Sequence, residues 1–358
     1  MKYIDEYRDE KIAQSILKEI NAISKKKVNL MEVCGTHTVV IFRNGIKKIL
    51  PKNINLISGP GCPVCVTPVS YLDEIIALSR ENDFIITTFG DMIKVPGSTS
   101  SLEREKANGA DIRIVYSTLD ALNIARNNPL KKVVFMGIGF ETTSPTIASA
   151  ILKAKEEKIN NFSVLSVAKI MPPAMKSLLD VEEVNIDGFI CPGHVSAIIG
   201  SDPYNFIASQ YKVSCVICGF EPLDILQSIY MLIKQIEEGK AKVEIQYKRV
   251  VKPEGNKIAL KKLKKVFSIV NSNWRGIGNI PQSGLEIRNE YSTFNARKFK
   301  ITVEETKEFA GCRCGEVLRG MITPIECPLF KKVCTPEDPK GACMVSSEGT
   351  CAAYYKYN

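Results

Sequence analysis

The C-terminal part of this chain is dense in cysteine and punctuated by proline. Six of the twelve cysteines lie beyond residue 311, in a segment that also carries four prolines. Such a segment cannot build a sufficient apolar core, so it needs another source of stability, and a metal centre supplies it. We therefore expect the tail to fold around metal. The six cysteines are Cys312, Cys314, Cys327, Cys334, Cys343 and Cys351.

The spacing of the tail cysteines favours an iron–sulfur cluster over zinc. Structural zinc sites usually contain paired C-x2-C units, and the tail has none. The four cysteines from Cys327 to Cys351 are widely spread, so separate loops can converge on a [4Fe-4S] cluster. Zinc is the alternative. The surplus Cys312 and Cys314 would form a redox-active dithiol beside the cluster, or exchange roles with the other ligands.

Composition and length are those of an ordinary globular protein with two or three domains. Hydrophobic residues make up 45% and charged residues 24% of the 358 positions. No run approaches the roughly 20 apolar residues of a membrane helix. The charged N-terminus lacks the apolar core of a signal peptide. We therefore expect a cytoplasmic protein, in which clustered cysteines serve as ligands or redox groups rather than structural disulfides.

The net charge of +9 is moderate, and its densest basic block is residues 257–265, KIALKKLKK. This block predicts an amphipathic helix with a solvated basic face. A docking site for an acidic protein is the alternative interpretation. Nucleic acid is disfavoured because aromatic residues are not interleaved with the lysines. We expect binding to neither nucleic acid nor membrane.

Short β-branched runs alternate with helical patterns between about residues 28 and 240, which predicts an α/β fold with parallel sheets. Eight strands in two sets of four imply two sheet-containing halves. The N-terminal helix is expected to pack against the tail. The predicted strands are 28–33, 54–58, 84–88, 112–116, 133–137, 163–167, 188–191 and 213–217, and helices are expected at 68–79, 118–125, 143–157 and 222–238.

The first motif with chemically reactive side chains is CGTHT, residues 34–38, at the end of the first predicted strand. Thr36 or Thr38 is expected to cap the following helix. A helix N-terminus favours a thiolate, so Cys34 is a candidate reactive thiol, with His37 as ligand or base. The alternatives are an inert buried cysteine and a hydrogen-bonded structural histidine.

The second motif, residues 58–65 (SGPGCPVC), follows the second strand and is expected to open a helix. A C-x-x-C unit at a helix start is typical of a dithiol/disulfide exchange centre, in which the pKa of the first thiol is lowered. Cys62 and Cys65 are therefore a candidate redox pair, with half of a zinc site as the alternative. Cys215 and Cys218 share the spacing but lie in a predicted buried strand, so we interpret them as core residues. The role of Cys191 is left open.

Two further motifs carry polar groups after strands. Residues 137–143 (GIGFETT) contain glycines but neither a Walker A nor a dinucleotide fingerprint. We expect them to line a cleft shared with residues 191–196 (CPGHVS), although a structural histidine is an alternative in the second motif. The cleft candidates are Asp91, Glu141, Thr142, His194 and Glu221.

In combination, these motifs resemble those of the HypD family of hydrogenase maturation proteins. No single segment is specific, but the combination is, and it covers essentially the whole chain. The matching segments, in order, are 34–38, 59–65, 139–143, 191–194, 311–315 and 351–355.

The resemblance implies three domains. Two related α/β domains, 28–130 and 131–240, would face a cleft, and residues 1–27 and 241–358 would form a third domain from both chain ends. The third domain would hold a [4Fe-4S] cluster. The implied cluster ligands are Cys327, Cys334, Cys343 and Cys351.

The resemblance also implies a role as a scaffold with the small chaperone HypC. On it, an iron atom would receive two cyanides and a carbon monoxide before delivery to [NiFe]-hydrogenase, with HypE donating cyanide as a thiocyanate on its C-terminal cysteine. Cys34 would hold the iron together with a HypC thiolate, and Cys62 and Cys65 would be redox-active. We expect a redox-active assembly scaffold rather than a conventional turnover enzyme, monomeric when alone.

Two alternatives stay open on the sequence. One is a stand-alone iron–sulfur oxidoreductase that acts on thiols and disulfides without a partner. The other is a zinc-stabilised interaction module without catalysis.

Overall fold

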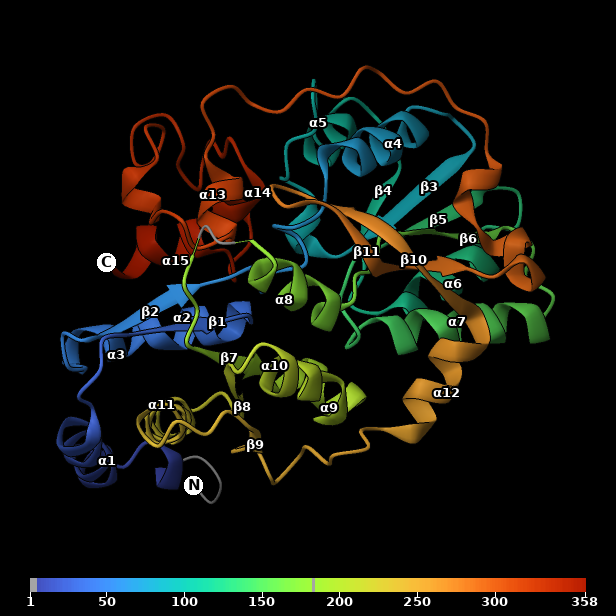
Figure 1. Cartoon of the computed structure of the whole chain (residues 1–358). Coiled ribbons are helices and arrows are strands. Elements are labelled where there is room, and N and C mark those ends of the chain that lie inside the picture. Colours follow the sequence, from blue (N-terminus) through green and yellow to red (C-terminus); the bar gives the residue numbers. More distant parts are fainter. Residues whose placement is uncertain (1–4, 182–183) are drawn as a thin grey trace.

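The computed structural model describes residues 5–181 and 184–358, which form two parallel β-sheets and an antiparallel hairpin (Figure 1). The first sheet has the strand order β2-β1-β7-β8-β9, the second has the order β4-β3-β5-β6, and β10 pairs with β11. The α/β class is therefore confirmed. The strands are β1 Val28–Glu32, β2 Ile54–Ser58, β3 Phe84–Thr88, β4 Ile112–Ile114, β5 Lys132–Gly137, β6 Phe162–Ser166, β7 Gly188–Pro192, β8 Ser214–Cys218, β9 Val243–Ile245, β10 Phe267–Trp274 and β11 Gly278–Ile287.

All eight predicted strands are present, but their expected grouping into two sets in chain order is wrong. The chain leaves the first sheet after β2, builds the second sheet with β3 to β6, and returns at β7. Leu30 of β1 is opposite Leu56 of β2 on one side and Gly188 of β7 on the other. A strand buried on both faces needs such a central place, so residues 28–130 contribute strands to both sheets.

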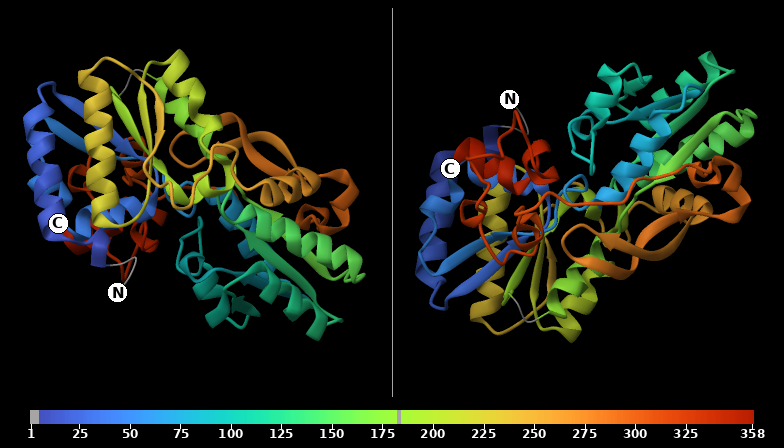
Figure 2. Two further views of the ribbon diagram at one scale, coloured as in Figure 1. Left: turned by 90° about the horizontal axis from the view of Figure 1, so that it is seen from below. Right: turned by 90° about the horizontal axis from the view of Figure 1, so that it is seen from above.

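Helices cover both faces of each sheet, as expected for parallel strands joined by crossovers (Figure 2). The α-helices are α1 Glu10–Ile23, α2 Gly35–Arg43, α3 Ile46–Ile49, α4 Val69–Ser79, α5 Leu102–Ala107, α6 Thr118–Asn127, α7 Ser144–Glu156, α8 Met171–Leu179, α9 Gly193–Ile199, α10 Asn205–Gln210, α11 Pro222–Glu237, α12 Lys257–Val266, α13 Cys314–Leu318, α14 Ala342–Val345 and α15 Thr350–Tyr357. Short 3-10 turns occur at Asp5–Tyr7, Gly90–Met92, Asp202–Tyr204, Asn289–Phe294, Ala296–Lys298 and Pro324–Glu326.

The N-terminal helix does not pack against the tail as expected. Helix α1 begins after the N-cap Asp9, whose carboxylate accepts from the backbone N–H groups of Lys11 and Ile12. Its fully buried Ile20 shares an apolar cluster with Ile229 and other residues of α11. The long apolar face of α11 offers this helix more contact area than a proline-rich tail does.

The tail packs instead beside the first sheet. Residues 300–309 contain no helix or strand and lead from the hairpin side of the molecule to α13 (Figure 1). Helix α15 lies on α2, where the rings of Phe42 and Tyr354 are 4.4 Å apart. Figure 2 shows the tail beside the β1–α2 region in both views. This packing brings the cysteine-rich segment to the loop after β1.

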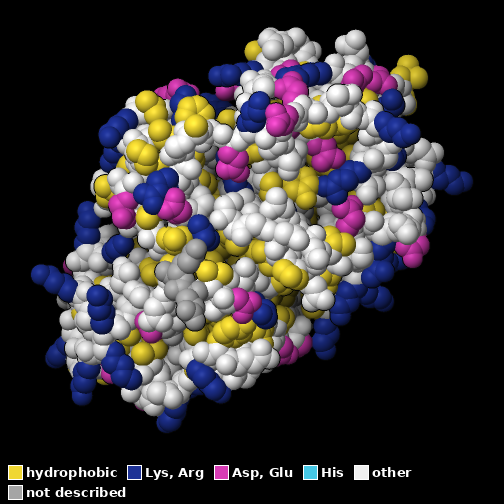
Figure 3. Space-filling view, turned by 45° about the horizontal axis from the view of Figure 1, so that its top comes forward, with side chains coloured by type: hydrophobic (Ala, Val, Ile, Leu, Met, Phe, Trp, Pro, Cys, Tyr) yellow, Lys and Arg dark blue, Asp and Glu magenta, His cyan; other side chains and the backbone are white. Residues whose placement is uncertain are grey.

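The basic block is a helix, as predicted. In α12, Leu263 and Val266 are buried whereas Ile258 is 73% exposed. On the face shown in Figure 3, lysine and arginine side chains are interspersed with acidic ones. Among the described residues, no helix combines the length and apolar character needed to span a bilayer.

Candidate functional site

Three of the sequence motifs, residues 34–38, 58–65 and 191–196, meet at one edge of the five-stranded sheet. Glu32, at the end of β1, is opposite Ser58 of β2 and Ile190 of β7. Pro192 of β7 is in turn opposite Cys218 of β8. The loops after β2, β1, β7 and β8 are therefore neighbours. Parallel strands place their carboxyl ends at a common edge, where ligand sites in such sheets usually form.

The loops after β1 and β2 touch at Gly61. The backbone N–H of Gly35 donates to the carbonyl oxygen of Gly61 at 3.0 Å. A Cβ atom at position 61 would lie only 2.2 Å from the backbone nitrogen of Cys34. Glycine is thus needed here for close approach of two backbones, and the contact brings Cys34 next to the turn that carries Cys62.

Cys34 is the N-cap residue of α2 and is 8% exposed. Burial, reinforced by the charges of Glu348 and Glu32, raises the pKa of its thiol to about 12, and hydrogen bonds from the backbone of Thr36 and His37 only partly offset this. The expectation that the helix terminus would favour a free thiolate is therefore wrong for the metal-free site. A coordinated metal cation removes this penalty, because it deprotonates the thiol that binds it.

Two carboxyl groups flank Cys34, and the sequence analysis identified neither. Glu32 is buried, which raises its pKa to about 8, and it accepts from the Cys34 N–H and the Thr38 hydroxyl. Glu348 comes from the tail and accepts from the Thr36 hydroxyl. Neither threonine caps α2, contrary to expectation. Glu32 is a charged residue in the otherwise largely apolar strand β1, and this pattern could have identified it. The position of Glu348 beside Cys34 follows only from the tertiary fold.

His37 is fully buried and faces β8. Its Nε2 lies 3.0 Å from the carbonyl oxygen of Gly219 and 3.3 Å from that of Cys218. Both partners are acceptors, so Nε2 carries the proton and Nδ1, which has no partner, is left as an acceptor. Burial lowers the pKa of His37 to about 4. The histidine is therefore neutral at physiological pH.

Phe220 links the two histidines of the chain. Its ring stacks on His37 with centroids 5.0 Å apart and on His194 at 3.7 Å. His194 is the more exposed of the two histidines, and partial burial of its ring lowers its pKa. Sequence reasoning missed Phe220. Glu221, the next residue, points to a different partner, since its carboxylate pairs with Arg8 at 2.7 Å.

The C-x-x-C unit connects the sheet edge to the tail. It lies in a turn, and α4 begins only at Val69, so the expected position at a helix start is wrong. The backbone N–H of Cys65 donates to Cys62 Sγ at 3.2 Å. Cys65 Sγ lies 3.9 Å from the carbonyl oxygen of Ala342, which precedes Cys343. Burial raises the pKa of Cys65 well above its usual value.

The six tail thiols gather around this point. Cys343 Sγ lies 3.1 Å from Cys314 Sγ, and a Cβ atom at Gly341 would meet Cys312 Sγ at 3.0 Å. The backbone N–H of Lys340 donates to Cys334 Sγ at 3.4 Å. The remaining two members, Cys327 and Cys351, pack with Cys334 in a small apolar cluster. All twelve cysteines are free thiols.

The thiol geometry does not match a mononuclear site. In the part of the chain that the structure describes, no three histidine, cysteine, aspartate or glutamate side chains converge closely enough to hold one metal ion. A four-iron cluster has a different requirement, because each thiolate binds a separate iron. The donor set and its location in a largely buried patch suit such a cluster.

The other cleft candidates follow strands of the second sheet. Glu141 comes after β5 and is 3% exposed, and its Oε1 accepts from the N–H of Met171 at 3.0 Å. Asp91 comes after β3 and accepts from the hydroxyl of Ser346 in the tail. Thr142 is exposed. Asp91 thus contacts the same tail segment as Glu348, whereas Glu141 contacts the start of α8.

The remaining cysteines lie in the core of the first sheet. Cys215 and Cys218 are fully buried in β8, as predicted, and Cys191 is fully buried in β7.

These features define a class of protein: an α/β scaffold that holds a buried thiol at a strand end, a dithiol turn beside it and a cysteine-rich tail against both. The family profile described as "HypD: Hydrogenase formation hypA family" matches residues 11–358. The chain belongs to the HypD family of hydrogenase maturation factors.

Relatives from bacteria and archaea are similar in sequence to this chain over all or nearly all of its length. The chain is 45% identical to the hydrogenase maturation factor HypD of Cupriavidus necator, over 100% of this chain and 97% of the relative. It is 44% identical to HypD of Escherichia coli, over 100% and 98%. It is also 44% identical to a putative hydrogenase expression/formation protein of Methanocaldococcus jannaschii, over 98% of both chains.

Proposed function

We propose that this chain is the scaffold on which the Fe(CN)2CO group of [NiFe]-hydrogenase is assembled, in complex with HypC and with HypE as cyanide donor. The observation that carries the proposal is the contact between Cys34 and the Cys62 turn through Gly61. The same turn reaches the tail at Cys343. Thiols from three segments that are distant in the sequence thus lie one after another, from the tail through the Cys62–Cys65 turn to Cys34. Cys34 is a buried thiol suited to hold iron.

In this proposal Cys34 binds the iron that is being assembled. Thiolate is a soft ligand and suits the low-spin iron that cyanide and carbon monoxide produce. A second thiolate would come from HypC. His37, one helical turn from Cys34, is neutral and keeps Nδ1 unpartnered, so it can accept a hydrogen bond at that atom, whereas burial, which lowers its pKa to about 4, opposes its protonation.

The dithiol turn provides a route for cyanide release from a thiocyanate. A thiolate that attacks the thiocyanate sulfur forms a mixed disulfide, and the S–C bond breaks so that cyanide leaves with its electron pair and binds the iron. Cys62 is the better attacking thiol, because its Sγ accepts a backbone N–H, whereas burial raises the pKa of Cys65 well above its usual value. Cys65 then displaces the donor as a free thiol, which leaves a Cys62–Cys65 disulfide.

Two electrons and two protons return this disulfide to the dithiol. A [4Fe-4S] cluster in the tail would supply electrons one at a time from an external one-electron donor. Cys343 lies between the turn and the other tail thiols, so it is placed to exchange disulfide bonds with the Cys65 side of the turn.

The structure offers a reason to revise the expected ligand set. Cys314 Sγ and Cys343 Sγ are 3.1 Å apart, which is too close for thiolates on two corners of a cubane but suits a dithiol. We therefore favour Cys312 as a ligand in place of Cys343, and Cys314–Cys343 as the redox pair. The proposed ligands are then Cys312, Cys327, Cys334 and Cys351.

The decisive test is infrared spectroscopy of the chain co-purified anaerobically with HypC. The wild-type complex is expected to show iron–cyanide bands, and Cys34→Ser is expected to abolish them while the cluster absorption survives. Cys215→Ser, a fully buried thiol of β8, is the matched control and should retain the bands. Full band intensity in Cys34→Ser would refute iron binding by Cys34.

Metal analysis of the same preparations separates the alternatives. About four irons with acid-labile sulfide per chain are expected from one cluster. Zinc without sulfide would support an interaction module instead. Turnover of a small disulfide without any partner would support a stand-alone oxidoreductase.

A further inference from the structure

Arg275 lies between the dithiol turn and the tail thiols. It follows β10 directly and is 4% exposed. Its backbone N–H donates to the carbonyl oxygen of Val66 at 2.8 Å, one residue after Cys65. A Cβ atom on the next residue, Gly276, would lie 2.1 Å from Cα of Gly315, the residue after Cys314. The backbone around Arg275 is therefore fixed on both sides by segments that carry thiols.

The guanidinium group of Arg275 lacks adequate partners. Its Nε and Nη1 atoms are inaccessible to solvent and donate to no acceptor among the described residues. In the described part of the chain, it pairs with the carboxylate of Glu308, whose Oε1 is 3.7 Å from Nε and whose side chain is 57% exposed. An arginine keeps its charge in any protein environment, and a buried charge without a close partner is strongly unfavourable. A further negative charge on the buried side of the guanidinium group would therefore stabilise Arg275.

The thiols are the groups that can supply that anion. Burial acts to lower the pKa of Arg275, but the neighbouring Cys314, Glu308 and Cys343 outweigh it and raise the pKa. Cys312 contributes in the same direction. As neutral thiols these groups leave the guanidinium nearly uncompensated. Cys312, a proposed cluster ligand, would become a thiolate when the cluster binds, and the cluster would then supply negative charge near Arg275.

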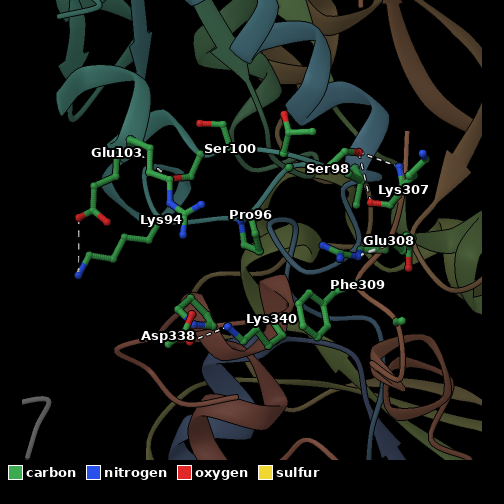
Figure 4. A pocket seen from close by; sticks show the side chains of 18 of the residues that line it. Lys94, Pro96, Ser98, Ser100, Glu103, Lys307, Glu308, Phe309, Asp338 and Lys340 are labelled. Carbon is green, nitrogen blue, oxygen red and sulfur yellow. Dashed lines mark hydrogen bonds and ion pairs between the residues drawn. The ribbon is translucent and has the colours of Figure 1, made fainter. Parts of the chain in front are cut away.

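A cavity on the outer side of Arg275 offers a competing explanation. It has a volume of about 420 Å³ and includes Ser98, Lys307 and Glu308 in its lining (Figure 4). Lys340 in its wall pairs with Asp338 at 2.5 Å. Glu308, which lines the cavity, comes only within 3.7 Å of Nε, and Nε and Nη1 are themselves inaccessible to solvent. The backbone contacts of Arg275 and Gly276 place this buried side chain next to the segments that carry Cys65 and Cys314.

We propose that Arg275 is the fixed counter-charge of the iron–sulfur centre in the tail, a positioning residue that makes the centre easier to reduce. The role rests on the proposed function insofar as the tail must hold a cluster. One-electron reduction adds a negative charge to the cluster and its thiolates. A permanent cation beside it stabilises the reduced form without any proton transfer.

The test compares reduction potentials of the full-length chain after anaerobic cluster assembly. Dithionite titrations in the presence of mediators, followed by electron paramagnetic resonance, would be made on the wild type, Arg275→Met and Arg275→Lys. Arg275→Met is expected to lower the equilibrium constant for reduction about tenfold, a shift of ~59 mV for a one-electron couple. Arg275→Lys keeps the charge and should stay close to wild type. Arg126→Met, on α6, is the control for loss of an arginine elsewhere.

A second measurement separates this role from simple packing. In the cluster-free protein, Arg275→Met should raise the thermal unfolding midpoint, because it removes an uncompensated charge. In the cluster-loaded protein, the same substitution should speed loss of iron to a chelator. Equal potentials in wild type and Arg275→Met, or equal destabilisation with and without the cluster, would overturn the proposal.

The outcomes also distinguish this inference from the proposed function. Unchanged potentials together with normal iron–cyanide bands would reject the role of Arg275 and leave the scaffold function intact. A wild-type chain that contains no acid-labile sulfide would reject the cluster and, with it, the role of Arg275.

Discussion

The hydroxyl of Thr36 donates a hydrogen bond of 2.5 Å to Oε1 of Glu348, a residue 312 positions further along the chain. The preceding residue, Gly35, is pressed against the same glutamate, since a Cβ there would lie 2.6 Å from its carbonyl oxygen. The tail therefore forms one wall of the Cys34 site. The segment that holds the proposed redox-active thiols also shapes the place where the iron would be bound, so loss of tail order should impair both proposed roles.

The Thr36–Glu348 contact can be measured with a double-mutant cycle. We expect Thr36→Val and Glu348→Gln to show a coupling energy of about 1 kcal/mol in urea unfolding, because the half-buried hydrogen bond to a carboxylate is lost in Thr36→Val and becomes a weaker bond to a neutral amide oxygen in Glu348→Gln. Thr142→Val with Glu348→Gln is the control, since Thr142 is exposed and follows a strand of the other sheet. Strict additivity of Thr36→Val and Glu348→Gln would show that the contact contributes nothing.

Gly61 offers a test of the contact between the two motif loops. Gly61→Ala places a methyl group 2.2 Å from the Cys34 nitrogen, so the loops must separate. We expect a loss of roughly 1–3 kcal/mol in unfolding free energy, typical of overpacking, and reduced iron binding in the HypC complex.

Gly90→Ala is the matched control for that substitution. Its added Cβ would meet no atom closer than 3.8 Å, from Ile114, so stability should change little. Equal stability of the two alanine variants would contradict the close approach at Gly61.

The strands were predictable because each is a short apolar run bounded by turn residues. Their grouping was not, since neighbours in a parallel sheet are chosen by long-range packing that a local pattern does not record. The hairpin of β10 and β11 was missed for a local reason. Pro281 and Gly284 interrupt its second strand, and the register shifts between Val270 and Ser272.

The candidate site residues also divide into those that a local sequence pattern indicates and those that it does not. Cys34, Cys62 and the tail cysteines were identified because thiols in glycine- and proline-rich turns are uncommon in ordinary cores. Arg275 and Phe220 were missed, since an arginine and a phenylalanine carry no local signal of function. The effect of burial on the pKa of Cys34 was also misjudged, because exposure depends on the tail that covers the site.

The Cys314–Cys343 contact predicts a specific disulfide. In protein from which iron has been removed, mild oxidation should link these two residues first, since their sulfur atoms are already 3.1 Å apart and a disulfide requires about 2.05 Å. Peptide mapping by mass spectrometry would identify the bond.

Cys215 is the internal control for this experiment, because it is fully buried in β8 and should remain a free thiol. A first disulfide between Cys312 and Cys314 instead would restore the pair suggested by the sequence and return Cys343 to the ligand set.

Glu141 should make stability depend on pH. Burial raises its pKa from 4.5 to about 7, so the folded state binds more protons than the unfolded state between these values. Stability contributed by the protonated carboxyl is therefore complete below pH 4.5 and is lost as pH rises to about 7, after which the loss is constant. At 1.36 kcal/mol per pKa unit, the full cost is roughly 3 kcal/mol.

Glu141→Gln removes this titration and retains an oxygen that can accept from the N–H of Met171. In urea unfolding, the variant should match the wild type near pH 4.5 and exceed its stability progressively up to about pH 7. Glu156→Gln, at the exposed end of α7, controls for the loss of one carboxylate. A stability difference that stays constant from pH 4.5 to pH 8 would mean that Glu141 is already ionised in the folded state. Its Oε2, which has no hydrogen-bond partner among the described residues, would then carry a buried negative charge.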